Sequence, residues 1–513
     1  MRKPATQTAS KGYQPKPTAI ASLLMATLAV LGGCSFIPTY ERPAAPVATA
    51  YPVADAAATT AQSSASLRWQ QFFTDARLQK LIALAIDNNR DLRVAAQSIE
   101  QARAQYGITR ANQFPTVNGV VSGSRSRLQS QSSANGANAG GGSAGINSYY
   151  TVGLQVTAYE LDFFGRVASL KEQALAQYLA TEEGRKTTQI SLIAQVANSY
   201  LAILADEELL DITRRTLTTR EESLKLSKLR FDSGVTSELD YRLVESLLEA
   251  ARFAYAQQQR QRQLDDNALT LLVGQPLSTL GPDFLPPSTA ALPLSGIAAN
   301  AVSLAQAQPM VDVPAGLPSE LLESRPDIRQ AEQLLMASNA NIGAARAAFF
   351  PKISLTVQAG TTSNQLARLF DSGTFAWTLA PQLLAPIFDA GRNQAGLDSA
   401  KAQQGIAIAQ YEKAIQLAFR EVADALATRA TLGDQLRASQ AQVNAETVRL
   451  RLARLRYDNG VASYLDALDA QRSLFTVQQL LVQTRLQQLQ SQVTLYKVLG
   501  GGWTEPAQPT VAR

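Results

Sequence analysis

The stretch LRYDNGVASYLDALDAQ, residues 455–471, decides the fold of this chain because it occurs twice. Residues 229–245 read LRFDSGVTSELDYRLVE, which keeps Leu, Arg, Asp, Gly, Val, Ser, Leu and Asp at matching places. In the later copy Gly460 can take the left-handed conformation that ends a helix, and Ser463 can cap the helix that follows. Ser237 can cap in the same way in the earlier copy. Each stretch therefore predicts a tight turn between two helices.

Further matches in the same order extend this duplication along the chain. The matched pairs are 91–93 (DLR) with 327–329 (DIR), 108–115 (ITRANQFP) with 343–351 (GAARAAFFP), Gly165-Arg166 with Gly391-Arg392, and Val273-Gly274 with Leu499-Gly500. Chance similarity between helical segments does not explain an ordered series, so we interpret the chain as internally duplicated. The first repeat is assigned to 75–274, a proline-containing linker to 275–318, the second repeat to 319–500 and a tail to 501–513.

Each repeat is predicted to contain one helix, a pair of strands and a long helical hairpin. The first helix, 75–112, ends before Phe114-Pro115 because the residue before a proline leaves helical geometry. The strand pairs are predicted at 115–160 and 352–386. There, apolar residues alternate with small or polar ones, as in the series Val152, Leu154, Val156, Ala158 and the series Ile353, Leu355, Val357, Ala359. A period of two fits a tilted membrane strand, or one face of a soluble antiparallel sheet.

The helical hairpins are predicted at 163–274 and 388–500. No proline occurs between Gly165 and Pro276. The stretch of roughly 68 residues to Asp232 would form a helix about 100 Å long at 1.5 Å per residue. Apolar residues within it step by three and four, a spacing typical of coiled coils: Ile190, Ile193, Ala197, Tyr200 and Leu204. We therefore expect long, coiled-coil-like helices.

Four predicted membrane strands are too few for one chain to close a barrel, which needs about eight. An open sheet edge cannot lie in lipid. If the strands span a membrane, several copies must share one barrel, so that two copies would give eight strands and three would give twelve. The expected fold class is mainly α with a membrane β-barrel portion.

Residues 1–33 have the features of a signal peptide, which takes no part in the fold. A basic region precedes an apolar run of roughly 13 residues, 19–31, which is too short to span a bilayer as a helix. The run ends in Leu31-Gly32-Gly33-Cys34, which matches a bacterial lipobox and predicts covalent lipid on Cys34. Ser35 follows instead of Asp, so we expect delivery to the outer membrane, with 34–74 as a lipidated, extended N-terminal segment. An ordinary signal peptide with an incidental cysteine is the alternative.

The composition argues against an enzyme and against a nucleic-acid-binding protein. The chain has no histidine, which excludes histidine-based acid–base catalysis and histidine-ligated metals. Residues 1–33 carry four Lys and Arg and no Asp or Glu, so the net charge of +5 falls to +1 without them. The loop 130–148 is rich in Gly and Ser but lacks the Gly-Lys-Ser/Thr of a phosphate-binding loop. We expect no catalytic residue, no metal and no cofactor besides the lipid on Cys34.

The chain resembles the TolC-type outer-membrane efflux proteins, specifically their OprM/NodT-like lipoprotein branch. The resemblance covers the mature chain from Cys34 to about Gly501. It is carried by the two turns and by LGGCSFIPTYERPAAPVATAYP (31–52), ELDFFGR (160–166), LPSELLESRPDIRQAEQLL (317–335) and FREVADAL (419–426). It implies a homotrimer with a shared twelve-stranded barrel in the outer membrane and a helical barrel that projects through the periplasm. It also implies a periplasmic adaptor protein as partner, and an inner-membrane pump, commonly of the resistance-nodulation-division class.

The same resemblance places a periplasmic gate at the second turn. The implied gate residues are Leu465 as an apolar constriction, Asp466 and Asp469 as charged latch groups, Arg472 as their bonding partner, and Asp240 as the acidic position of the first copy. Threefold symmetry would turn each inward residue into a ring, and rings of Asp narrow and charge a pore. The first copy has Leu243 and Ser246 opposite Asp469 and Arg472, so we expect it to play a supporting role. Carboxylates that only complement a helix dipole, or paired acids of a glycoside hydrolase, are the alternatives.

The outermost residues of the turns are expected to contact the adaptor: Gly234, Val235, Thr236, Gly460, Val461 and Ala462. Ordinary turn chemistry is the alternative there. The predicted function is the outer-membrane channel of a tripartite efflux system, a passive duct for drugs or other small toxic solutes. Two other functions stay open at this point, a duct of a protein secretion system and a periplasmic coiled-coil scaffold lipoprotein without a pore.

Overall fold

The structure is a computed structural model of the chain. It describes residues 35–48, 50–51, 67–127, 146–277, 280, 284, 304, 310–311 and 325–503. The chain divides into two compact units. The strand unit comprises 1–42, 103–177 and 334–407, and the helical unit comprises 43–102, 178–333 and 408–513. Four helices contribute residues to both units: α4 (Arg90–Ala111), α5 (Arg166–Asp232), α8 (Pro326–Ala347) and α9 (Arg392–Asp458).

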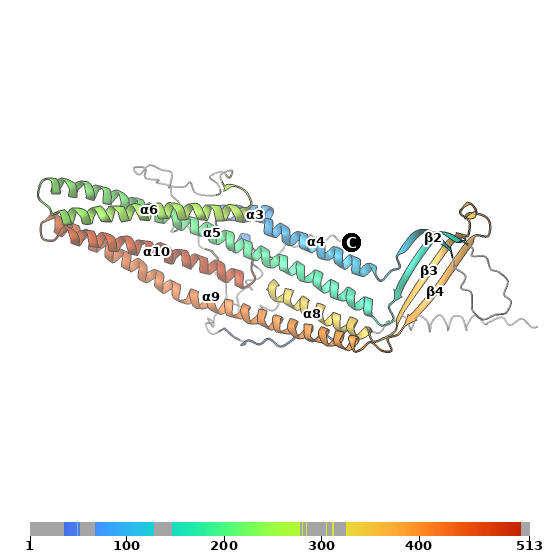
Figure 1. Cartoon of the computed structure of the whole chain (residues 1–513). Helices are drawn as coiled ribbons and strands as arrows, with labels where there is room; N and C mark the ends of the chain where they lie inside the picture. The colour runs from blue at the N-terminus through green and yellow to red at the C-terminus, as the bar shows by residue number, and fades with distance from the viewer. Residues whose placement is uncertain are drawn as a thin grey trace, which may run out of the picture. The chain divides into compact units, whose positions relative to one another are not determined.

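Two hairpins of very long helices make up most of the helical unit (Figure 1). Helix α5 pairs with α6 (Glu238–Val273), and α9 pairs with α10 (Tyr464–Val498). Helices α5 and α9 have 67 residues each, as long as the sequence predicts. The coiled-coil series of α5 is buried at every position: Ile190, Ile193, Ala197, Tyr200 and Leu204. Burial of these side chains, more than intrinsic helix propensity, stabilises helices of this length.

The single helix predicted over 75–112 is wrong, because the structure has two helices there. Helix α3 (Ala76–Asn88) ends and α4 begins on either side of Asn89, whose backbone is extended. The Asn89 side-chain amide donates to the Leu272 carbonyl (2.9 Å), and its side-chain oxygen accepts from the Leu92 N–H (3.0 Å). The first bond joins residues 183 positions apart. A local pattern of apolar residues therefore does not reveal the break.

Aromatic rings attach the N-terminal part of the helical unit to α10. Phe72 of the short helix α2 (Trp69–Phe72) stacks on Tyr496 with ring centroids 4.0 Å apart, and Phe73 meets the same ring edge-on. The Tyr496 hydroxyl donates to the Leu67 carbonyl (2.7 Å). The segment 34–74, predicted to be extended, therefore contains one helical turn that is fixed by burial of aromatic surface.

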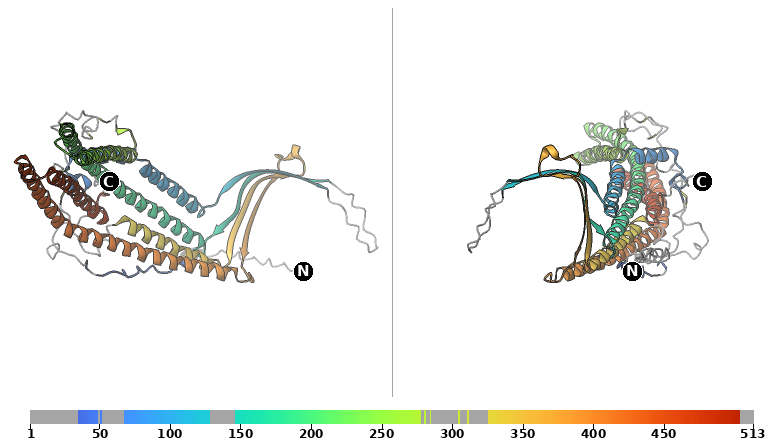
Figure 2. Two further views of the ribbon diagram at one scale, coloured as in Figure 1. Left: turned by 60° about the vertical axis from the view of Figure 1, so that its left-hand side comes forward. Right: turned by 90° about the vertical axis from the view of Figure 1, so that its right-hand side faces the viewer.

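The strand unit contains one antiparallel sheet, β1 (Val117–Arg127), β2 (Ile146–Leu161), β3 (Lys352–Ser363) and β4 (Phe375–Leu384), in that order (Figure 2). A short 3-10 helix, η6 (Leu366–Arg368), lies between β3 and β4. The register aligns side chains of one kind across all four strands. Val117, Val156, Val357 and Leu379 form one row, and Asn118, Gln155, Gln358 and Thr378 form the next row. Successive residues point to opposite faces, so one face is apolar and the other polar, as in a strand between lipid and water.

The predicted alternation in β2 stops at a bulge. The register with β3 shifts between Val156 and Tyr159, and Ala158 has a φ of 49°. The Ala158 N–H donates to the Thr356 hydroxyl (3.2 Å) instead of continuing the ladder. Ala158 therefore does not extend the apolar series that ends at Val156, and the prediction is wrong at this residue. Bulges of this kind bend a strand and increase its twist.

Strands β2 and β3 approach each other closely where two glycines face one another. Gly153 pairs directly with Gly360. A Cβ on Gly360 would lie 2.3 Å from the Val152 carbonyl oxygen, and a Cβ on Gly153 would lie 2.5 Å from the Ala359 carbonyl oxygen. No side chain fits at such distances, so the close approach of the two strands requires glycine at both positions.

Strands β1 and β4 are edges, since each pairs on one side only within the described residues. The apolar side chains of β4 are exposed: Phe375, Trp377, Leu379, Leu383 and Leu384. In a membrane, one chain alone would leave the backbone N–H and C=O groups at the edges of β1 and β4 without hydrogen-bond partners. If the sheet lies in a membrane, strands of other copies must therefore pair with these edges.

The segment that follows the predicted lipidation site packs on α8 within the strand unit. Phe36 stacks on Phe350 with centroids 4.6 Å apart, and its carbonyl accepts from Arg346 (3.2 Å). The Pro38 carbonyl accepts from the Asn339 amide (2.8 Å). Phe36 is two residues from Cys34 in the sequence, but Cys34 itself lies outside the described residues.

Candidate functional site

The turns that end the two helical hairpins have the same backbone. Gly460 has a φ of 72° and Gly234 a φ of 71°. The Val461 N–H donates to the Arg456 carbonyl (2.9 Å), and the corresponding bond closes the first turn (2.8 Å). A Cβ at either glycine would meet no atom within 4 Å. The left-handed backbone, and not crowding, therefore requires glycine at the two tips.

The first carboxylate after each turn has a different environment in the two copies. Ser237 and Ser463 cap α6 and α10. The Asp240 carboxylate accepts from the hydroxyls of Ser237 (2.7 Å) and Thr236 (3.1 Å), and these bonds hold its pKa below the usual value. The Asp466 carboxylate is exposed and has no side-chain hydrogen bond or ion pair within the part of the chain that the structure describes. Asp466 is thus available to an ion or to another chain.

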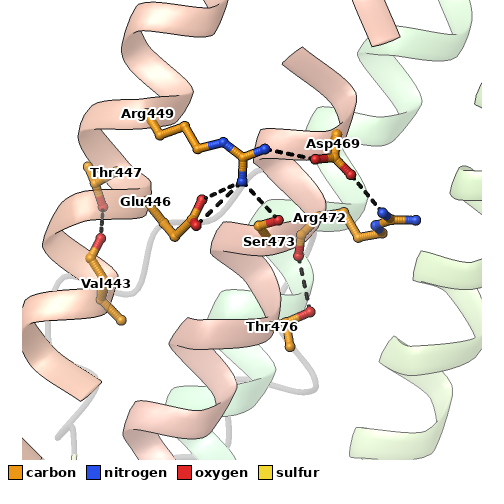
Figure 3. Close-up of polar contacts among 8 residues, drawn as sticks. All are labelled: Val443, Glu446, Thr447, Arg449, Asp469, Arg472, Ser473 and Thr476. Carbon is orange, nitrogen blue, oxygen red and sulfur yellow. Dashed lines mark hydrogen bonds and ion pairs between the residues drawn. The ribbon is translucent and has the colours of Figure 1, made fainter. Parts of the chain in front are cut away.

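A network on α9 and α10, here called the latch cluster, lies close to the second turn (Figure 3). Its members are Glu446, Arg449, Asp469, Arg472 and Ser473. Asp469 accepts from Arg449 Nη2 (2.8 Å) and from Arg472 Nη2 (2.6 Å), one on each carboxylate oxygen. Arg449 also bonds Glu446 (3.1 Å) and the Ser473 hydroxyl (3.3 Å). The hydrogen bond to Asp469, followed by that to Glu446, raises the pKa of Arg449. The cluster ties the two helices of the second hairpin together.

The structure brings only part of the predicted gate together. Asp469 and Arg472 form the expected ion pair, whereas Asp466 lies outside the latch cluster. Arg449 was not among the predicted residues, although the sequence contains a signal for it. Arg449 lies eleven residues before Gly460, and Arg472 lies eleven residues after Val461. Positions at equal distance from a turn lie side by side in an antiparallel hairpin, so counting from the turn identifies Arg449.

A groove of about 840 Å³ lies beside the latch cluster, between α6, α9 and α10. Leu465, the predicted constriction, lines this groove and is 57% exposed. Leu243, which stands in the first copy where Asp469 stands in the second, lines the same groove. The first hairpin therefore contributes an apolar wall to a site whose charges come from the second hairpin.

The two hairpin tips contact each other within the helical unit. The Arg230 guanidinium on α5 donates to the Tyr457 hydroxyl on α9 and lies 5.7 Å from the centre of the Tyr457 ring. A cavity of about 320 Å³ between the tips is lined by both hairpins, with Asp240 on one side and Leu465 on the other. Asp240 therefore belongs to the contact between the tips and not to the latch cluster.

The outermost turn residues are accessible, as a docking surface requires. Val235 is 66% exposed and Val461 is 69% exposed. Gly234 and Gly460 are exposed, and Thr236 and Ala462 are half-buried. The tips thus present two apolar side chains on rigid turns.

Comparison with known proteins relates these features to a family. Outer membrane efflux proteins match the chain twice, over 81–275 and 317–501. The probable efflux pump outer membrane protein TtgC of Pseudomonas putida is 47% identical over 485 residues, which are 94% of this chain and 95% of that protein. Outer membrane protein OprJ of Pseudomonas aeruginosa is 43% identical over 503 residues, covering 97% of this chain and 99% of that protein.

Solved structures agree with these sequence matches. A membrane protein from Pseudomonas aeruginosa has a TM-score of 0.81 and 42% identity, over 93% of this chain and all of that chain. The open state of the MtrE outer membrane channel of Neisseria gonorrhoeae has a TM-score of 0.79 and 40% identity, with the same coverage. The two-faced sheet and the paired helical hairpins are thus those of an outer-membrane channel. The chain belongs to the family of outer membrane efflux proteins, and the predicted family, fold class, efflux function and location are confirmed.

Proposed function

We propose that this outer-membrane efflux protein is a passive trimeric duct for drugs or other small toxic solutes, gated at its helical tips. The observation that carries the gate is the latch cluster, in which two arginines from different helices hold one aspartate. The channel would move solutes without chemistry of its own. The relatives are named for the export of antibiotics, toluene and other solvents, which favours small solutes as cargo.

The two open edges of the sheet support a trimer. Four strands per chain with edges at β1 and β4 require further copies to pair those edges in lipid. Three copies would give twelve strands, within the range of closed membrane barrels. The same symmetry would bring three second tips and three first tips around one axis.

The latch cluster supports a closed resting state. Asp469 is held by Arg449 of α9 and Arg472 of α10, so α10 cannot swing away from α9 without breaking at least one charged hydrogen bond. These groups are partly exposed, so each pair is weak singly. Three copies of the cluster would act together around one pore. Asp466, without an intrachain partner among the described residues, would form the free ring of carboxylates that favours cations.

The partners we propose are a periplasmic adaptor and an inner-membrane pump, of the resistance-nodulation-division class. The exposed valines of the two tips offer the adaptor small apolar contacts, and the relatives are themselves components of efflux pumps. Energy for export would come from the pump.

Covalent lipid on Cys34 would anchor the protein in the outer membrane. Phe36 packs on Phe350, which lies two residues before β3, so the chain next to Cys34 is held near the start of a proposed membrane strand. We expect Cys34→Ser to abolish labelling of the protein by a radioactive or clickable fatty acid in cells. Labelling that persists in this variant would refute the anchor.

Conductance in planar lipid bilayers tests the gate. Replacing Asp466 and Asp469 together by Ala should raise the single-channel conductance several-fold, because the latch and the carboxylate ring are both lost. The matched control is Asp240→Ala with Leu243→Ala, at the same two positions of the first copy, where we expect a much smaller change. An unchanged conductance in the Asp466→Ala, Asp469→Ala variant would refute the gate.

A further inference from the structure

A small cavity between α5, α9 and α10 has an unusual lining. Its volume is about 170 Å³, and it lies wholly within the helical unit. The polar groups that line it include Arg220, Arg454, Gln471 and Arg215, and the lining also contains Phe475. No Asp or Glu is among its lining residues. The cavity is separate from the groove at the latch cluster.

Arg220 is the buried charged residue among those that line this cavity. Its side chain is 4% exposed, and its Nη1 has no hydrogen-bond partner. No carboxylate pairs with it within the described residues. Burial lowers the pKa of Arg220, Tyr464 opposes this shift, and the positive charges of Arg454 and Arg472 add to it. A buried guanidinium without a counter-charge is costly, and proteins satisfy such a group with a carboxylate or a bound anion.

The remaining polar groups are compatible with an anion. Arg454 is exposed on α9 and has no ion pair within the described residues, so its guanidinium is available to a ligand in the cavity. Arg215 is already paired with Asp211. The side-chain oxygen of Gln471 is buried without a partner. A half-turn of this amide would present its NH₂ group to the cavity, and the two orientations of an amide are nearly indistinguishable in shape.

We propose that this cavity is a binding site for a small oxyanion, held by the guanidinium groups of Arg220 and Arg454. The planar fork of a guanidinium matches two oxygens of a phosphate or carboxylate. The anion would supply the counter-charge that Arg220 lacks. It would also offset the repulsion between Arg220 and Arg472, and Arg472 is a member of the latch cluster. Binding itself does not depend on the proposed function, whereas its effect on the latch does.

Calorimetric titration of the purified full-length protein in detergent tests the site. Inorganic phosphate, and separately acetate, are titrated at constant ionic strength set by chloride. We expect saturable binding of about one anion per chain for at least one of the two. The affinity for the anion should fall at least tenfold in the Arg454→Gln variant, and it should fall in Arg220→Gln as well. Arg437→Gln is the matched control, since Arg437 is an exposed arginine of the same helix and pairs with Asp434 outside the cavity.

Two outcomes would overturn the proposal. The first is the absence of saturable binding of either anion. A carboxylate side chain of a partner protein would then remain as the counter-charge for Arg220. The second is binding that Arg454→Gln and Arg220→Gln leave unchanged. Arg454 is exposed, so the Arg454→Gln variant keeps the test decisive if Arg220→Gln does not fold. If phosphate lowers the single-channel conductance of the wild type but not of Arg454→Gln, the bound anion also acts on the latch cluster. If phosphate does not lower the conductance, only the effect on the latch is refuted, and the binding site itself is not.

Discussion

The two helical hairpins share a backbone plan but differ in the charged groups at several matching positions. In the first hairpin a buried polar network lies far from the tip, where Arg262 donates to Glu207 (2.8 Å) and Gln258 donates to Asp206 (2.8 Å). The ion pairs near its tip, such as Arg242 with Glu245, are exposed. Asp206 lies 28 residues before Gly234, or about 42 Å along the helix. The matching position of the second hairpin holds Leu432, which is buried.

Near the turns some matching positions differ in charge as well. The second hairpin has the latch cluster, whereas the first has Ser223, Leu243 and Ser246 at the positions of Arg449, Asp469 and Arg472. The turn glycines and capping serines are the same in both. The two copies thus share the groups that set the backbone and the carboxylates Asp240 and Asp466, but differ in the charged groups of the latch cluster. We infer that the second tip moves or locks, and that the first serves as a fixed wall.

The largest effect should come from removing the residue that joins α9 to the latch. Arg449→Ala removes one of the two donors to Asp469, so we expect the single-channel conductance to rise about as much as it does in Asp469→Ala. Ser223→Ala, at the same position of the first hairpin, should leave conductance unchanged. Equal changes in single-channel conductance in the two variants would show that the hairpins are functionally alike and would contradict the difference between them.

A second prediction concerns the buried charges of the first hairpin. Burial and then the neighbouring Asp265 carboxylate raise the pKa of Asp206 to about 8. Its folded pKa exceeds the unfolded value, so the native state binds the extra proton and the free energy of unfolding falls as pH rises from about 4 to about 8. The Asp206→Asn variant keeps a side-chain oxygen that can accept from Gln258, and it removes the fall in the free energy of unfolding at high pH. We expect it to stabilise the protein at pH 8.5 by a few kcal/mol at most.

Thermal unfolding at pH 5 and pH 8.5 measures this difference. The gain in melting temperature from Asp206→Asn should be larger at the higher pH. Asp434→Asn is the control, because Asp434 is an exposed carboxylate of the second hairpin and should give no pH-dependent gain. A gain that is equal at both pH values would mean that Asp206 is ionised in the folded protein.

The smallest effects should come from the shared turns. Gly234→Ala and Gly460→Ala each place a Cβ on a left-handed residue without a steric clash, so each should destabilise the protein by about 1–2 kcal/mol. Urea unfolding should give similar losses for both. A loss at only one glycine would show that the two tips differ in backbone as well as in charge.

Much of this architecture is predictable because it repeats or alternates. The duplicated turns, the long helices and the two-faced strands all follow from local patterns with a fixed period. The latch pair Asp469–Arg472 follows as well, since its members are three residues apart on one helix. Each of these features depends on neighbours in sequence.

The features that escape prediction depend on partners far along the chain. The break at Asn89 needs the Leu272 carbonyl, and the bulge at Ala158 needs the Thr356 hydroxyl. Arg449 joins Asp469 across a turn, so only counting from that turn, and no pattern within its own helix, indicates the contact. Arg220 is unremarkable in sequence, and only the packing of three helices shows that its charge is buried.

The open edges of the sheet also have a consequence for inheritance. In the trimer that we propose, β1 and β4 of each chain are completed by other copies, so a chain shares its defects with every assembly that it joins. A variant that folds and pairs but blocks the pore, such as one with its latch locked by an engineered disulfide, would therefore suppress the wild-type protein made in the same cell. A variant such as Gly360→Val, which prevents the strands from meeting, would be excluded from assemblies and would leave the wild type unharmed. The site of a mutation along the chain thus decides whether it is dominant or recessive.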